Sequence, residues 1–147
     1  MSIRPIQTRD LPFILAIQCA CPEIAQWTIR DYARVIEGDM AGWVEEQKDE
    51  LAGFVVARRV SSELEILNFA VQPDLRNRGI GRALLEQALS WGATFQGENA
   101  FLEVRASNLA ALRFYEHNGF EVTGRRPRYY SAPIEDALVL AAPLRSP

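Results

Sequence analysis

The segment of the sequence best suited to chemistry is basic and contains two closely spaced glycines. It reads Arg76-Asn77-Arg78-Gly79-Ile80-Gly81-Arg82-Ala83-Leu84. Glycine lets the backbone approach a ligand closely, and the amides in the first turn of a following helix have no partner within that helix. The positive end of the helix dipole and three arginines also favour an anion. The segment therefore predicts a cradle for a pyrophosphate group.

A strand and a helix are expected to position this cradle. Residues 64–71 are typical of a strand, Pro73 and Asp74 of a turn, and residues 80–91 of a helix. A further strand is expected at 100–104. A strand, a helix and a second strand in this order form a βαβ crossover, which pairs the two strands in parallel.

The rest of the chain predicts a mixed α/β sheet with antiparallel strands at its start. A first helix is expected over 11–19 with Thr8 as its cap, and a second after Thr28 that Gly38 closes. The other expected elements are strands at 3–6, 41–46 and 51–60, a charged turn at 47–50, a helix over 108–117 stopped by Asn118 and Gly119, and strands at 120–124 and 134–140.

Composition excludes several classes of protein. The chain has 147 residues, which suits a single domain over residues 1–147, and 48% of them are hydrophobic. With 16 basic and 19 acidic side chains the net charge is −3, so nothing overall favours nucleic-acid binding. No run approaches the ~20 apolar residues of a membrane span, so we expect a cytoplasmic protein with no membrane partner. Cys19, Cys21 and His117 are too few ligands for a metal site.

Three motifs, in order, resemble the GCN5-related N-acetyltransferase (GNAT) superfamily. They are Asn68-Phe69-Ala70-Val71, the basic glycine segment, and Ala106-Ser107-Asn108 followed by Tyr115-Glu116-His117-Asn118-Gly119-Phe120. The resemblance implies a GNAT-like fold with helices on both sides of the sheet. It also implies that acetyl-coenzyme A (acetyl-CoA) is the cosubstrate. Its pyrophosphate would bind the segment from Arg76 to Ala83, its acetyl group the edge at Phe69, Ala70 and Val71, and its pantetheine arm Asn108.

A closer similarity is to the RimI-type ribosomal-protein-alanine N-acetyltransferases. It rests on Leu102-Glu103-Val104-Arg105-Ala106-Ser107-Asn108 and on Arg128-Tyr129-Tyr130 followed by Glu135-Asp136-Ala137-Leu138. The similarity implies that Glu103 is the general base, Tyr115 the general acid, and the N-terminal amine of a ribosomal protein the acceptor. Trp27, Tyr129 and Tyr130 are then expected to shape the acceptor site. Residues 22–28 match only through Trp27-Thr28, and Ile134 stands where glycine commonly precedes the Glu-Asp pair.

The residues alone leave other roles open. Period-two alternation places Phe101, Glu103 and Arg105 on one strand face, where Glu103 could simply pair with Arg105 or with a neighbouring strand. Tyr115 could be an ordinary core residue, and either Ser107 or Asn108 could cap the helix that follows. A backbone N–H near Ala70 or Val71 could stabilise the acetyl oxygen if a bulge or splay frees it.

Other functions also fit the sequence. The acceptor could be a small-molecule amine, or the chain could be a coenzyme A sensor without catalytic activity. A nucleotide-binding module is a weaker alternative, because no lysine-serine pair follows the glycines. A ping-pong reaction through Cys19 or Cys21 is disfavoured, since both lie near a helix end where the dipole does not stabilise a thiolate.

Overall fold

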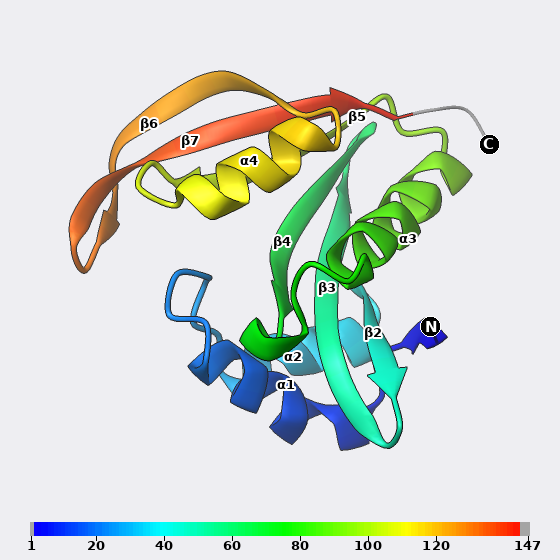
Figure 1. Ribbon diagram of the computed structural model, residues 1–147. Coiled ribbons are helices and arrows are strands. Elements are labelled where there is room, and N and C mark those ends of the chain that lie inside the picture. The colour runs from blue at the N-terminus through cyan, green and yellow to red at the C-terminus, as the bar shows by residue number, and fades with distance from the viewer. Residues whose placement is uncertain (1, 145–147) are drawn as a thin grey trace.

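A computed structural model describes residues 2–144 and contains one mixed sheet of seven strands. The strands lie in the order β1-β2-β3-β4-β5-β7-β6 (Figure 1). Their bounds are β1 Ser2–Pro5, β2 Ala41–Gln47, β3 Glu50–Val60, β4 Glu63–Val71, β5 Asn99–Arg105, β6 Glu121–Ser131 and β7 Ile134–Pro143. The α-helices are α1 Leu11–Cys19, α2 Ile29–Glu37, α3 Ile80–Thr94 and α4 Leu109–His117, and short 3-10 turns span Thr8–Asp10 and Pro73–Leu75. The mixed α/β sheet predicted from the sequence is confirmed.

Local signals fix the ends of the second helix. The Thr28 side chain accepts a hydrogen bond from the Asp31 amide, and Asp31 accepts one from the Thr28 amide, so the two residues form a capping box. Gly38 ends α2 in the left-handed conformation with φ 112°. The prediction that Thr8 caps the first helix is wrong. Thr8 lies inside a 3-10 turn, and the Asp10 carboxylate accepts the Gln7 amide at the start of that turn.

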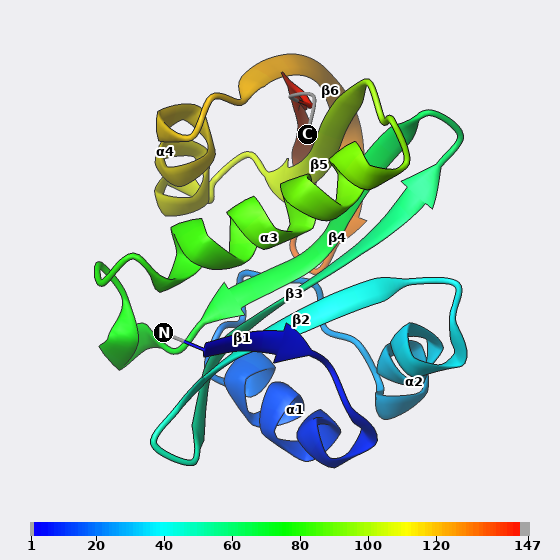
Figure 2. The same cartoon turned by 90° about the vertical axis from the view of Figure 1, so that its right-hand side faces the viewer.

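Helices cover both faces of the sheet (Figure 2). Successive residues of β3 point to opposite faces, so Val55 packs in the core that contains Leu84 of α3, whereas Phe54 packs in the core that contains Ile14 of α1 and Tyr32 of α2. Helix α4 adds Leu112 and Tyr115 to the α3 side. The helices thus hold the sheet from both sides and fix the strand ends that carry the site.

The parallel pair β4–β5 separates after a short contact. Strand β4 pairs with β5 only from Glu63 to Glu65, opposite residues 99–101. A register shift against β3 follows, because Ala57 lies opposite Ile66 and Val56 opposite Asn68. This bulge at residue 67 bends β4 away from β5. The later part of β4 and the end of β5 therefore diverge. The βαβ crossover predicted from the sequence did not reveal this divergence.

The C-terminal hairpin is longer than the sequence predicts. Strand β6 runs to Ser131 rather than ending near residue 124, with shifts in its pairing to β7 at 122/124 and 126/130. Figure 1 shows the far end of this hairpin opposite the loop that joins α1 to α2, residues 20–28 (the α1–α2 loop). Among residues 2–144 no helix has the length and apolar character needed to cross a bilayer.

Candidate active site

Two hollows lie where β4 and β5 separate. The larger has a volume of about 640 Å³ and is lined by the α1–α2 loop, β4, β5 and the end of β6. The smaller has a volume of about 320 Å³ and is lined by the end of β4, the glycine segment and α4. Six residues line both hollows, namely Glu23, Ile24, Phe69, Asn108, Ala111 and Tyr115. The hollows therefore meet at these residues, which form their junction.

The residues predicted from the sequence divide between the two hollows. Glu103, Trp27, Tyr129 and Tyr130 line only the larger one. The smaller is lined by most of the predicted coenzyme residues, namely Phe69, Ala70, Val71, Arg76, Asn77, Gly79, Ile80, Gly81, Arg82 and Asn108. In the described part of the chain, Arg78 and Ala83 line neither hollow.

The turn before α3 presents to the smaller hollow backbone amides that have no hydrogen-bond acceptor within residues 2–144. Asn77 and Gly79 both have left-handed backbones, with φ 64° and 82°, and Gly79 caps α3 without a side-chain hydrogen bond. The first amide that bonds back into the helix is that of Ala83, which donates to the Gly79 carbonyl at 3.1 Å. The amides of residues 80–82 thus remain available at the positive end of a 15-residue helix. This geometry fits a pyrophosphate group.

The three arginines of the segment differ in their surroundings. The Arg76 guanidinium donates to the Val71 carbonyl, and its Nη2 lies 3.2 Å from both the Cys21 sulfur and a Glu23 carboxylate oxygen. Arg82 forms an exposed ion pair with Glu86 one turn along α3. Arg76 thus ties the turn to the chain after α1, and a role for the three arginines in binding an anion stays a prediction.

The separation of the strands exposes one edge of β4. The Gln72 amide donates to the Ala52 carbonyl of β3 at 2.8 Å, and amides alternate in direction along a strand. The amides of Val71 and Phe69 consequently point away from β3. The Phe69 amide donates to the side chain of the preceding residue, Asn68, at 3.1 Å. The Val71 amide, on the wall of the smaller hollow, is left as a donor for a carbonyl oxygen.

Glu103 projects from β5 into the larger hollow and is largely buried, with 14% of its side chain exposed. Its Oε1 lies 3.2 Å from Nε of Arg126 on β6. Its Oε2 is buried and has no hydrogen-bond partner among residues 2–144. Glu103 therefore pairs with neither Arg105 nor the adjacent strand β7, the two options from the sequence, but with β6 on the far side of β7, while Arg105 pairs with Glu135.

Tyr115 projects from α4 to the junction of the hollows. Its ring packs edge-on against Phe69 and Phe120, with centroids 6.2 and 5.5 Å apart, so its place in the core is confirmed. Burial raises the pKa of its hydroxyl above the ordinary value. The hydroxyl therefore stays protonated at neutral pH and can donate a hydrogen bond at the junction.

Asn108 caps the helix that carries Tyr115. Its Oδ1 accepts the Ala111 amide at 3.2 Å, so this residue rather than Ser107 is the cap. The Ser107 amide donates instead to Glu135 at 2.7 Å. The cap uses only the oxygen of the Asn108 side chain, and the residue still lines both hollows.

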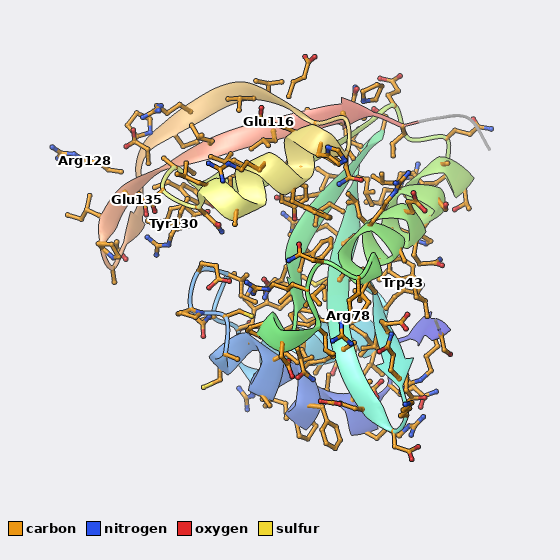
Figure 3. All side chains as sticks on the ribbon, in the orientation of Figure 1. Trp43, Arg78, Glu116, Arg128, Tyr130 and Glu135 are labelled. Carbon is orange, nitrogen blue, oxygen red and sulfur yellow. The ribbon has the colours of Figure 1, made fainter. Side chains whose placement is uncertain are left out.

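Aromatic side chains form the outer wall of the larger hollow. The guanidinium of Arg105 lies 4.3 Å from the ring centre of Tyr130, and Figure 3 shows Tyr130 beside Glu135 on the β6–β7 hairpin while Arg128 points away. Burial, together with the charge of Glu103, raises the pKa of Tyr130 to about 12. On the opposite wall, Trp27 packs against Tyr32 with centroids 5.0 Å apart. Tyr130 therefore contributes a neutral hydroxyl and an apolar ring.

A buried polar network, missed in the sequence, holds the α1–α2 loop against β4. The Asn68 side-chain amide donates to the Ala25 carbonyl at 3.0 Å and to the Tyr32 hydroxyl at 2.9 Å. The Tyr32 hydroxyl donates to Gln18, whose side chain bonds both the amide and the carbonyl of Trp27. Gln18 falls among apolar residues at helical spacing in α1, and that pattern was the one available signal of a buried polar side chain.

The two cysteines lie outside the hollows. Among the described residues they form no disulfide, and neither lines either hollow. Cys21 has the positive neighbour that the sequence did not reveal, Arg76, yet burial raises the pKa of its thiol. In residues 2–144 there is also no cluster of three or more histidine, cysteine and acidic residues that could hold a metal ion.

Comparisons with known proteins agree with this geometry. A sequence model of the Acetyltransferase (GNAT) family matches residues 3–120. The [ribosomal protein bS18]-alanine N-acetyltransferase of Escherichia coli K12 is 32% identical over 145 residues, 97% of each chain. The enzyme of that name from Salmonella typhimurium is 43% identical over 98 residues, 65% of this chain and 66% of the relative.

A solved structure shares the whole fold. The crystal structure of the ribosomal-protein-S18-alanine N-acetyltransferase from Escherichia coli superimposes with a TM-score of 0.84 at 31% identity. The match covers 99% of this chain and 95% of that one. The family match spans most of the sequence, and a turn suited to pyrophosphate lies beside the separated strands. The protein belongs to the GNAT family and is an acetyl-CoA-dependent N-acetyltransferase.

Proposed function

We propose that this protein acetylates the α-amine of the N-terminal alanine of ribosomal protein bS18. The observation that carries the proposal is the meeting of two hollows at Tyr115, one beside the pyrophosphate turn and the other beside Glu103. The relatives that match over nearly the whole chain carry this activity in their names. Because the acceptor is a ribosomal protein, we place the reaction in the cytoplasm.

Acetyl-CoA is proposed to bind in the smaller hollow. The free amides of residues 80–82 hold the pyrophosphate, and the pantetheine arm follows the exposed edge of β4 towards Tyr115. The Asn108 side-chain NH₂ is the group proposed to pair with the arm, since its oxygen is used in the cap. The Val71 amide, on the wall of the smaller hollow, is the proposed donor to the acetyl oxygen as charge develops on that oxygen.

The acceptor is proposed to enter through the larger hollow, where Glu103 takes a proton from its ammonium group. A peptide α-amine titrates near ~7.7–8.0, so a carboxylate acting directly or through one water can supply the neutral amine. A lysine side-chain amine has a pKa of about 10.4, so its deprotonation at neutral pH requires a stronger base. The neutral amine nitrogen then bonds to the acetyl carbon and gives up its second proton to water, while the carbon–sulfur bond breaks and the thiolate leaves with the electron pair.

Tyr115 is proposed to stabilise the departing thiolate. Its raised pKa lies above the ~8.5 of an ordinary thiol, which favours hydrogen bonding over complete proton transfer. Attack is direct in a ternary complex. Neither cysteine lines a hollow, and the Cys21 thiol has a raised pKa, so no acetyl-cysteine is proposed.

Mass spectrometry of an alanine-initiated bS18 peptide after incubation with acetyl-CoA tests this function. We expect one acetyl group on the terminal amine and none on the same peptide with its α-amine blocked and its lysines free. Equal acetylation of small amines such as polyamines would point to the alternative acceptor class. Coenzyme binding without thiol release for any amine would point to the sensor.

Substitution of the base tests the mechanism. Glu103→Gln keeps the shape of the side chain but removes proton uptake, so turnover at saturating substrates should fall about 100-fold or more. Unchanged turnover in this variant would contradict the role of Glu103.

A further inference from the structure

The ion pair between Glu103 and Arg126 lies beside the larger hollow, which is lined by Glu103 and not by Arg126. Glu103 is 14% exposed and Arg126 is 57% exposed, so the carboxylate is the more deeply buried partner. Oε2 of Glu103 is buried and lacks a partner within residues 2–144, whereas Oε1 is contacted by Arg126. A cation that approaches Glu103 from the hollow therefore meets the oxygen that Arg126 already holds.

The irregular end of β6 places Arg126 there. Its pairing with β7 shifts between Arg126 and Tyr130, and Arg128 has a left-handed backbone with φ 52°. Arg126 and its neighbour Arg125 point to opposite faces of the strand. Arg125 pairs with Asp136, while Arg126 lies over Glu103 and 5.7 Å from the ring centre of Tyr129.

We propose that Arg126 occupies the acceptor's ammonium position while no acceptor is bound, and that the incoming amine must displace it. Arg126 is then a specificity-determining residue. When its guanidinium leaves, Glu103 loses its positive partner, and only an acceptor with a cationic amine supplies a new one. The inference rests on the proposed role of Glu103 as the base that the acceptor contacts. An ion pair with one exposed partner is weak, which allows displacement by substrate.

Displacement predicts a specific kinetic pattern. Removal of the Arg126 charge ends the competition, so the acceptor binds more tightly. Because Arg126 has already left Glu103 in the ternary complex, turnover is unaffected. An Arg126 that merely supports the hairpin, or that binds the peptide itself, predicts instead an unchanged or higher KM for the acceptor.

The test compares Arg126→Gln with Arg125→Gln in initial-rate assays on an alanine-initiated peptide at saturating acetyl-CoA. The two arginines are matched, since they are adjacent, are 57% and 58% exposed, and lose the same charge. We expect Arg126→Gln to lower the peptide KM about two- to fivefold with kcat within about twofold, as suits a weak ion pair. Arg125→Gln should leave the peptide KM unchanged. An unchanged or raised KM in Arg126→Gln, or an equal fall in both variants, overturns the proposal.

A double-mutant cycle separates this inference from the proposed function. Peptide binding to the coenzyme A complex is measured by calorimetry for the wild type, Arg126→Gln, Glu103→Gln and the double variant. The gain in peptide affinity from Arg126→Gln should disappear in the variant that also carries Glu103→Gln. A gain in affinity that persists in the double variant overturns the proposal. Failure of the proposed function appears separately, as wild-type protein that binds the peptide but does not acetylate it. Wild-type protein that binds no peptide contradicts both.

Discussion

The side-chain amide of Asn68 donates a 2.9 Å hydrogen bond to the hydroxyl of Tyr32, and this contact joins strand β4 to the helix that follows the α1–α2 loop. Asn68 lies next to the bulge that separates β4 from β5. The same amide donates to the Ala25 carbonyl inside the loop. The buried side chain of Asn68 thus connects the bulge where β4 leaves β5 to the α1–α2 loop, the wall on which the acceptor is proposed to bind.

Tyr32→Phe tests whether this connection positions the acceptor wall. The change removes one hydroxyl from a fully buried residue and leaves the ring contacts with Trp27 and Phe54 in place. The hydroxyl makes two buried hydrogen bonds, one accepted from Asn68 and one donated to Gln18, and each costs about 1 kcal/mol to lose, so we expect the acceptor KM to rise about five- to thirtyfold. The KM for acetyl-CoA, measured in the same assay, should stay within about twofold. A lower melting temperature with an unchanged acceptor KM would show that the bond only stabilises the fold.

Tyr115→Phe isolates the hydroxyl at the junction of the two hollows. Its ring contacts with Phe69 and Phe120 remain, so coenzyme binding should be nearly unchanged. Loss of the donor to the leaving thiolate should lower kcat about 10- to 100-fold. Since burial raises the pKa of this hydroxyl, the wild type should lose no activity through its ionisation below about pH 10. Steady-state kinetics in both substrates, repeated across pH, measure these effects.

Helix ends were predictable where the sequence carries a local signal. Thr28 and Gly38 bound α2, and Asn118 and Gly119 follow α4, as expected. Helix α3 continues to Thr94 because Gly92, which follows Trp91, keeps a helical backbone and is buried close to Leu64 instead of ending the helix. Strand β6 was cut short because Pro127 and the neighbouring arginines are unusual in a strand, yet an edge strand with an interrupted ladder tolerates them.

The site was predictable only as far as local patterns reach. Alternation along β5 placed Glu103 on the face that meets the larger hollow, and helical spacing placed Tyr115 in the core. The partner of Glu103 could not be predicted, because the register shift in β6 brings Arg126 there. The bulge that bends β4 likewise depends on pairing with β3.

Gly79→Ala tests the backbone of the pyrophosphate turn, and Gly38→Ala is its matched control. Both glycines have left-handed backbones, with φ 82° and 112°, and a Cβ at either would meet no atom within 4 Å among the described residues. Each substitution should therefore cost about 1 kcal/mol of stability through backbone strain alone. Only Gly79→Ala should raise the KM for acetyl-CoA, by about three- to tenfold, because relief of the strain moves the free amides. Similar coenzyme kinetics in the two variants would contradict a role for this turn in pyrophosphate binding.

Asp10→Asn should reduce both the stability of the fold and its sensitivity to acid. The Asp10 carboxylate accepts two hydrogen bonds from Arg4, at 2.8 and 2.9 Å, and one from the Gln7 amide. Burial opposes ionisation, but these bonds outweigh it and lower the pKa of Asp10. A lowered folded-state pKa stabilises the fold above the unfolded value of about 3.9, and that contribution disappears as the pH falls through the folded value.

The expected loss for Asp10→Asn at pH 7 is about 1–3 kcal/mol of unfolding free energy, measured with denaturant. The difference from wild type should shrink steadily as the pH is lowered below about 4, because the wild type then loses the same ionised carboxylate. Asp39→Asn is the control, since it breaks an Arg34–Asp39 pair whose side chains are 50% and 58% exposed and should cost less than about 0.5 kcal/mol. A deficit for Asp10→Asn that stays constant into acid would mean that packing, rather than charge, makes Asp10 stabilising.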